Sequence, residues 1–192
     1  MRTFYKFIGV ICFITFSQQA KSQGIDELTI FNSLLDSIYD INTCVNEQDL
    51  DSLNQIMIIN DSLSTLDITK SKKYLLTQIP KTSMFYTLIK NIRKPLKARD
   101  FNLDSLQQRN IKFMTTEEFD DTKYEHRFGK TGKQLFLGYF DLSRIYADTA
   151  KGLAIFKMNW VGGGTCGYEK LILIHRDGDT WKIEKQIGLG VY

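Results

Sequence analysis

The chain is 192 residues long, with 43% hydrophobic and 12% aromatic residues, two prolines and a formal net charge of +3. This length suits one domain with a hydrophobic core that needs neither a structural metal nor a disulfide framework. The composition excludes an intrinsically disordered chain.

The first 22 residues predict a secretory signal peptide. Arg2 and Lys6 form a positive head, residues 7–16 form an apolar core, and residues 20–22 read Ala-Lys-Ser, a small-x-small cleavage signal. The core is too short to span a bilayer, so a retained anchor is the weaker interpretation. We therefore expect cleavage after Ser22 and one exported domain over residues 23–192, periplasmic or secreted, with no integral membrane span.

Signal cleavage changes the electrostatic character of the chain. The excess of positive charge is carried by Arg2, Lys6 and Lys21, and the first 22 residues contain no Asp or Glu. The remaining chain is neutral, and a neutral domain has no general field that attracts nucleic acid or an anionic membrane. The sequence therefore predicts no nucleic-acid partner.

Two cysteines remain after cleavage, because Cys12 lies in the signal peptide. In an oxidising compartment Cys44 and Cys166 can pair, and closing so long a loop would stabilise the fold by about 4 to 5 kcal/mol. Two unpaired, partly buried cysteines are an equally good interpretation, because a sequence does not fix the geometry of a bridge.

Three helices are predicted in the first half of the chain. Apolar residues recur at spacings of three and four between Ile25 and Ile41, which indicates an amphipathic helix. A short helix over residues 72–78 is halted by Pro80. A third helix, with a clearer apolar face, is predicted over residues 82–92, with Thr82 or Ser83 as its cap.

Shorter elements lie between and after these helices. Residues 55–60 contain an apolar run that suits a buried strand, and residues 111–114 read as another strand. Helical turns are predicted over residues 102–108 and 116–119.

The C-terminal third changes character, because β-branched and aromatic residues dominate from Lys133 onward. Asp177-Gly178 is the clearest hairpin signal in the chain. Sequential strands with short turns form an antiparallel meander. The predicted strands cover residues 134–146, 152–161, 168–176 and 180–187. The fold class is thus α+β, with an N-terminal helix and a helical middle packed on the inner face of an antiparallel sheet whose core is this meander.

Gly162, Gly164 and Gly167 have the spacing of a dinucleotide-binding fingerprint. That motif works because its third glycine opens a helix whose N-terminal amides hold the pyrophosphate, whereas residues 168–174 are strand-like. A glycine-rich bend or bulge between antiparallel strands explains the motif better. We expect no nucleotide and no other cofactor.

A small hydrolase is the alternative function. Cys166 near His126 or His175 would be a thiol nucleophile with a base, and the pairs Glu117-Glu118 and Asp120-Asp121 are candidate acid–base groups. Without catalysis, His175 is an ordinary half-exposed residue at a strand end, and the two carboxylate pairs belong to a solvated loop or helix end. No metal site is expected, because the histidines and cysteines lack the local spacing of ligands.

Several C-terminal motifs occur together. Tyr139 and Phe140 precede Leu-Ser-Arg at 142–144, a GGGTCGY bend spans 162–168, and Gly-x-x-Trp-Lys-Ile follows at 178–183. This combination resembles a family of small exported bacterial proteins of unknown function. The resemblance implies export and the α+β fold, and it confers no catalytic residue.

These observations predict a non-enzymatic binding or envelope-associated module whose partner is a small molecule or an envelope protein. The expected site comprises Ser143, Arg144, Trp160, the glycine bend and Tyr168. A lone arginine among strand residues either pairs with a buried carboxylate or faces an anionic ligand, and Arg144 is open to both interpretations. A third class, an assembly subunit, would display a long unpaired edge strand.

Overall fold

The structure is a computed structural model of the chain. It describes residues 26–40, 54–60, 62–102, 106, 111–115, 129–131, 134–162 and 167–191. The predicted signal peptide, Cys44, Cys166, His126, the two carboxylate pairs, the turn at 116–119 and most of the turn at 102–108 lie outside these residues.

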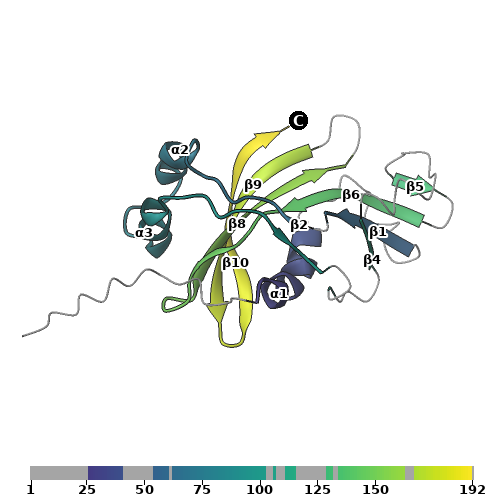
Figure 1. Cartoon of the computed structure of the whole chain (residues 1–192), viewed down its shortest axis with the longest axis horizontal. Helices are drawn as coiled ribbons and strands as arrows, with labels where there is room; N and C mark the ends of the chain where they lie inside the picture. Colours follow the sequence, from purple (N-terminus) through teal and green to yellow (C-terminus); the bar gives the residue numbers. More distant parts are fainter. Residues whose placement is uncertain are drawn as a thin grey trace, which may run out of the picture.

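A mixed sheet of eight strands forms the centre of the described part of the chain (Figure 1). Its main path runs β10-β9-β8-β6-β1-β4, with β5 also paired to β6 and β7 to β8. The strands are β1 (Asn54–Ile59), β4 (Ile111–Met114), β5 (Gly129–Thr131), β6 (Gln134–Leu142), β7 (Tyr146–Asp148), β8 (Leu153–Val161), β9 (Gly167–Asp177) and β10 (Thr180–Val191).

The predicted α+β class and the C-terminal meander are confirmed, because β8, β9 and β10 are consecutive antiparallel neighbours. Gly178, with φ of 61°, lies in the turn between β9 and β10. The sheet as a whole differs from the expectation, because β1 pairs in parallel with both β4 and β6. A continuous apolar run such as that of β1 suits a strand between two parallel neighbours.

The predicted strand over residues 134–146 divides in two. β6 ends at Leu142 and β7 starts at Tyr146, and both pair with β8. Between them Ser143, Arg144 and Ile145 form a short irregular segment. This break in the strand places Arg144 close to the first helix.

The predicted helices are confirmed as α1 (Glu27–Asp40), α2 (Lys72–Thr77) and α3 (Met84–Asn91). Asp26 caps α1, since its carboxylate accepts a hydrogen bond of 3.2 Å from the Leu28 N–H. Ser83 caps α3 by accepting from the Phe85 N–H at 3.2 Å. A small second sheet pairs β2 (Ser62–Leu63) with β3 (Arg99–Asp100).

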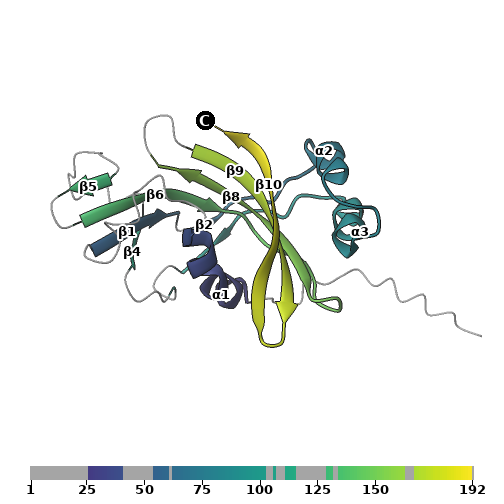
Figure 2. The ribbon, with the colours of Figure 1, turned by 180° about the vertical axis from the view of Figure 1, so that it is seen from behind.

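Helices cover both faces of the meander, whereas one packed face was expected (Figures 1 and 2). Along β8, Ala154, Phe156 and Met158 belong to the cluster that contains α1. Leu153 and Ile155 belong to the cluster that contains α2 and α3. Because strand side chains alternate between faces, the sheet lies between two hydrophobic layers.

Candidate functional site

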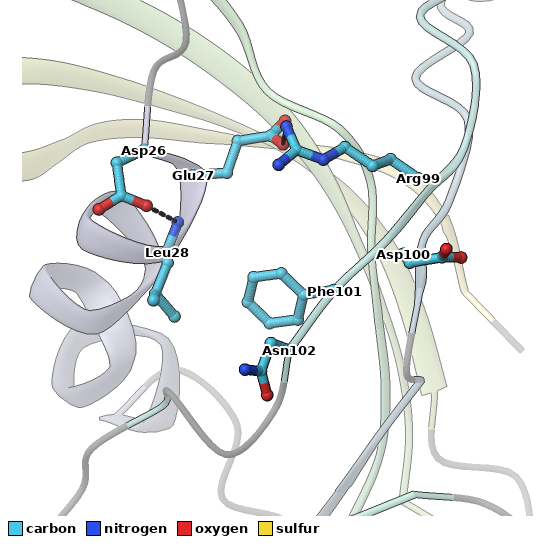
Figure 3. Close-up of a pocket in the computed structure, with 7 residues that line it drawn as sticks. All are labelled: Asp26, Glu27, Leu28, Arg99, Asp100, Phe101 and Asn102. Carbon is cyan, nitrogen blue, oxygen red and sulfur yellow. Dashed lines mark hydrogen bonds and ion pairs between the residues drawn. The ribbon is translucent and has the colours of Figure 1, made fainter.

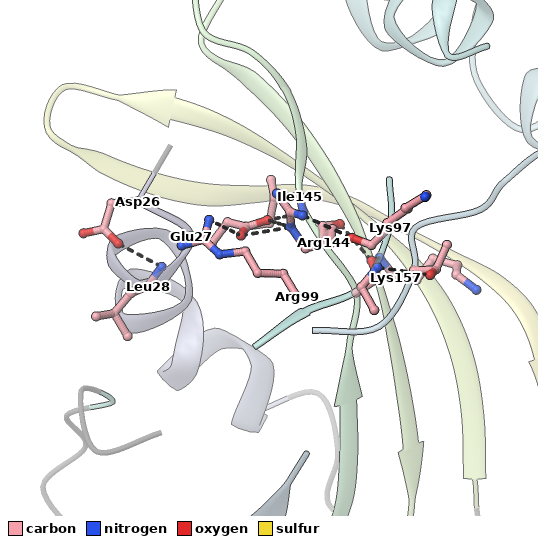
Figure 4. Close-up of polar contacts among 11 residues, drawn as sticks. Asp26, Glu27, Leu28, Lys97, Arg99, Arg144, Ile145 and Lys157 are labelled. Carbon is pink, nitrogen blue, oxygen red and sulfur yellow. Dashed lines mark hydrogen bonds and ion pairs between the residues drawn. The ribbon is translucent and has the colours of Figure 1, made fainter. Parts of the chain in front are cut away.

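The first turn of α1 contains a buried carboxylate. Glu27 is 7% exposed, and its Oε1 accepts hydrogen bonds from Nε of Arg144 and from the Ile145 N–H, each at 2.9 Å (Figure 4). Its Oε2 lies 3.1 Å from the same Arg144 Nε. A buried carboxylate needs such partners, so Arg144 and the Ile145 amide compensate the charge of Glu27.

Arg144 joins three segments of the chain. Besides its bonds to Glu27, its Nη1 donates to the Lys97 carbonyl at 3.1 Å, and its backbone N–H donates to the Ser64 carbonyl at 2.9 Å. Arg144 thus pairs with a buried carboxylate, the first of the two alternatives that the sequence left open. This pair fixes the N-terminus of α1 against the segment between β6 and β7.

Arg99, on β3, is a second guanidinium beside the same carboxylate. Its Nη1 lies 3.8 Å from Oε2 of Glu27, which is too long for a hydrogen bond, and its side chain is 62% exposed. Within the described residues this long ion pair is the one ion pair of the Arg99 side chain, which donates no hydrogen bond there. Arg99 therefore keeps N–H donors for a further acceptor.

An open cleft of about 180 Å³ lies where Arg99 and Glu27 meet (Figure 3). Half-buried Leu28 and Phe101 supply apolar surface, and the Phe101 ring packs edge-on against Phe31 with 5.7 Å between the centroids. The cleft is lined by Asp26, Glu27, Leu28, Arg99, Asp100, Phe101 and Asn102. It combines a cation with apolar surface and a polar rim.

Ser143 is fully buried and hydrogen-bonded. Its hydroxyl donates to the Arg144 carbonyl at 2.9 Å and accepts from the Lys157 N–H at 2.8 Å. Its backbone N–H donates to the Lys157 carbonyl at 3.0 Å. These bonds attach the irregular segment to β8, so Ser143 holds the backbone that carries Arg144.

Trp160 fills a slot in the core and is 3% exposed. A Cβ at Gly138 would come within 2.5 Å of the indole Nε1, and a Cβ at Gly162 within 2.4 Å of Cη2. The ring also packs on Phe140, with 6.4 Å between centroids, and on Tyr168, with 5.2 Å. Trp160 is thus enclosed by the sheet and two glycines.

Tyr168 has a buried hydroxyl for which the described residues supply no hydrogen-bond partner. Burial raises the pKa of this phenol above its ordinary value. The Lys170 ammonium lies 4.0 Å from the centroid of the Tyr168 ring, and burial lowers the pKa of this lysine. The structure thus groups the expected site residues as two pairs, Ser143 with Arg144 and Trp160 with Tyr168.

None of the seven residues that line the cleft was among the site residues expected from the sequence. Glu27 lies within the predicted first helix, while Arg99 and Phe101 fall between predicted elements. The one available signal was Arg144, which called for a carboxylate partner without indicating which one.

The groups considered for catalysis lie mostly outside the described residues. Within them, Nδ1 of His175 lies 3.1 Å from a Glu184 carboxylate oxygen on the β9–β10 hairpin. The described residues bring no three His, Cys, Asp or Glu side chains together in a group that could ligate a metal. Among the described helices, none has the length and apolar character required to cross a bilayer.

Comparisons with protein-family models, curated proteins and solved structures found no match for this chain. The resemblance to small exported bacterial proteins therefore stays a prediction from the C-terminal motifs.

Proposed function

We propose that this protein is an exported, non-enzymatic binding module whose cleft beside α1 takes a small organic carboxylate with an apolar portion. The observation that carries the proposal is the position of Arg99, a 62% exposed guanidinium beside a carboxylate that already has other partners. Because Arg144 compensates Glu27, the charge of Arg99 is available to a ligand.

The rest of the cleft supports a ligand of this kind. Leu28 and Phe101 offer apolar contacts for a ring or a short alkyl chain. Exposed Asp100 and Asn102 stand at the rim, where a carboxylate disfavours a second negative charge on the ligand. The cleft, of about 180 Å³, is smaller than the usual ligand pocket of about 300 Å³ or more, so its ligand must be small. We therefore expect a monoanion of benzoate size.

The lining residues also suit binding better than catalysis. The carboxylate of Asp26 accepts hydrogen bonds from the Leu28 N–H and the Thr29 hydroxyl in the first turn of α1. Glu27 is held by Arg144, and the seven lining residues include no Ser, Cys, Thr or Lys nucleophile. Donors and apolar surface remain as the groups available to a ligand.

A titration with benzoate tests the cleft. We expect chemical-shift changes at Leu28, Arg99 and Phe101 with a dissociation constant near 1 mM, which is about 4 kcal/mol of binding free energy. Benzamide, the neutral counterpart of the same shape, should bind at least tenfold more weakly because it lacks the charge.

Arg99→Gln is the matching variant, and Arg93→Gln is its control because Arg93 is exposed and does not line the cleft. We expect Arg99→Gln to weaken benzoate binding at least tenfold and Arg93→Gln to leave it unchanged. Equal binding of benzoate by the two variants, or equal binding of benzoate and benzamide to the wild type, would overturn the proposal.

Export is tested separately by expressing the full chain and determining the mass of the product outside the cytoplasm. A mature chain that starts at Gln23 supports export, whereas an intact chain retained in the cytoplasm contradicts it. Thiol counting on the same sample tests whether Cys44 and Cys166 are paired. Neither result changes the benzoate titration, so export and the cleft are tested independently.

A further inference from the structure

Positive charge is concentrated in one segment of the chain. Residues 68–97 contain eight Lys and Arg residues and no Asp or Glu, whereas the whole chain has a formal net charge of +3. The remainder of the chain is therefore net negative. We call this segment, which includes α2 and α3, the basic lobe. Its charged residues are Lys70, Lys72, Lys73, Lys81, Lys90, Arg93, Lys94 and Lys97.

The basic lobe is a distinct structural unit. Leu66, just before the lobe, and Leu96, near its end, are joined by reciprocal backbone hydrogen bonds of 3.0 and 3.1 Å. Figures 1 and 2 show α2 and α3 side by side at one end of the molecule, away from β5. Leu75 and Phe85 anchor the lobe to the sheet through the second hydrophobic cluster. The lobe thus presents its outer side to solvent.

Most of the positive charge on this outer side is uncompensated. Lys72 is used internally, because its ammonium donates to the Lys90 and Ile92 carbonyls at the end of α3. Seven others are exposed and form no ion pair within 4.0 Å with the described residues. They are Lys70, Lys73, Lys81, Lys90, Arg93, Lys94 and Lys97.

Two large apolar side chains are exposed on the same lobe. Tyr74 on α2 is 48% exposed, and Met84 at the start of α3 is 58% exposed. Tyr74 directly follows Lys73, and Met84 lies three positions after Lys81. Basic residues interspersed with an aromatic and an aliphatic side chain suit the boundary between lipid headgroups and acyl chains.

We propose that the basic lobe docks on the surface of a bilayer rich in anionic phospholipid. The lysine and arginine side chains face the lipid phosphates, while Tyr74 and Met84 enter the interfacial layer. The net negative remainder of the chain is repelled by the same surface, which orients the molecule with the lobe toward the bilayer. The proposal goes beyond the cleft and depends on none of the residues that line it.

Vesicle sedimentation of the protein recovered after export tests this docking. The probes are vesicles of phosphatidylglycerol mixed with phosphatidylcholine, vesicles of phosphatidylcholine alone, and soluble dextran sulfate. We expect binding to the phosphatidylglycerol vesicles, little binding to phosphatidylcholine, and a steep decrease with added salt.

The variant Lys73→Gln with Lys81→Gln removes two charges from the lobe, and Lys112→Gln with Lys151→Gln removes two charges outside it. Each lobe charge contributes about a fivefold factor in partitioning, so we expect the lobe variant to bind about 25-fold more weakly and the control to bind like wild type. Met84→Gln should weaken vesicle binding severalfold and leave dextran sulfate binding unchanged. Thermal unfolding of each variant verifies that it is folded.

Three outcomes would overturn the proposal. These are the absence of binding to phosphatidylglycerol vesicles, equal loss of binding in the lobe variant and its control, and binding to dextran sulfate without binding to vesicles. The last would identify the lobe as a site for a soluble polyanion. Failure here leaves the benzoate test of the cleft unaffected, because Arg99 is not altered.

Discussion

Arg144 and Glu27, separated by 117 positions in the chain, form a hydrogen-bonded ion pair in which Nε lies 2.9 Å from Oε1. Glu27 comes from the first turn of α1, and Arg144 comes from the segment between β6 and β7. The pair therefore holds the helix against the sheet, and its Glu27 member lines the cleft. The pair also distinguishes Arg144 from Arg99, because the guanidinium of Arg144 is bound to Glu27 whereas that of Arg99 keeps N–H donors for a ligand.

Breaking this pair should be costly. We expect Arg144→Met to lower the free energy of unfolding by about 3 kcal/mol, because it leaves the Glu27 charge buried with fewer partners. Adding Glu27→Gln to Arg144→Met should recover part of the loss, because no uncompensated charge then remains. Urea denaturation of the single and double variants measures both effects, and additive losses would contradict a direct pair.

Gly138 is expected to tolerate no side chain. Its φ of 117° is unfavourable for other residues, and a Cβ would come within 2.7 Å of the Val161 carbonyl oxygen as well as close to Trp160. Gly138→Ala should therefore destabilise the fold by about 3 kcal/mol or more.

Gly188→Ala is the control for Gly138, because a Cβ at Gly188 meets nothing within 4 Å. Its stability should stay within about 1 kcal/mol of wild type. Thermal unfolding of both variants compares them. A similar melting temperature for the two would show that Gly138 is not held against Trp160.

Lys72 stabilises α3 from another helix. Its ammonium donates to the Lys90 carbonyl at 2.8 Å and to the Ile92 carbonyl at 2.6 Å, where the helix dipole is negative. Lys72→Met should lower the free energy of unfolding by about 1 to 2 kcal/mol. The neighbouring exposed Lys73 is the control, and an equal loss for Lys73→Met would refute this specific role.

Tyr168 should make the fold sensitive to alkaline pH. Its pKa is raised by burial in the folded state, whereas in the unfolded chain it is about 10. Above pH 10 the unfolded chain therefore releases a proton that the folded state retains, and the free energy of unfolding decreases as pH rises. Below pH 9 the contribution of Tyr168 to the free energy of unfolding does not change with pH.

Tyr168→Phe isolates this effect, since Lys170 and every other titrating group remain. At pH 7 the variant should lie within about 1 kcal/mol of wild type, because the hydroxyl has no partner among the described residues. Between pH 9 and pH 11 the free energy of unfolding of the variant, measured by urea denaturation, should rise relative to that of the wild type. Parallel stability curves over that range would disprove the assignment.

The local elements were predictable from the sequence because each has a short-range signal. The 3.6-residue periodicity of α1, the Ser83 cap and the Asp177-Gly178 hairpin all depend on neighbouring residues. The alternation of Ala154, Phe156 and Met158 with Leu153 and Ile155 along β8 is likewise a local pattern, because successive strand residues point to opposite faces. The packing of helices on both faces of the meander was not predictable, because no local pattern specifies where α2 and α3 lie.

The parallel pairs of β1 and the cleft depend on contacts between distant parts of the chain. β1 lies between β4 and β6, and no local pattern specifies the register that aligns Met57 with Phe113. Arg144 was recognised as an arginine that needs an anion, yet its partner could not be named. The basic lobe was missed for a different reason, because the net charge of the whole chain averages its positive segment with an acidic remainder.

The roles of Arg99 and Arg144 can be separated in one experiment. Benzoate affinity and the free energy of unfolding are measured for wild type, Arg99→Gln and Arg144→Gln in the same buffer. We predict that Arg99→Gln loses benzoate affinity at least tenfold with stability within about 0.5 kcal/mol of wild type, and that Arg144→Gln loses about 2 to 3 kcal/mol of stability. Unchanged benzoate affinity in Arg99→Gln, or unchanged stability in Arg144→Gln, would contradict the account.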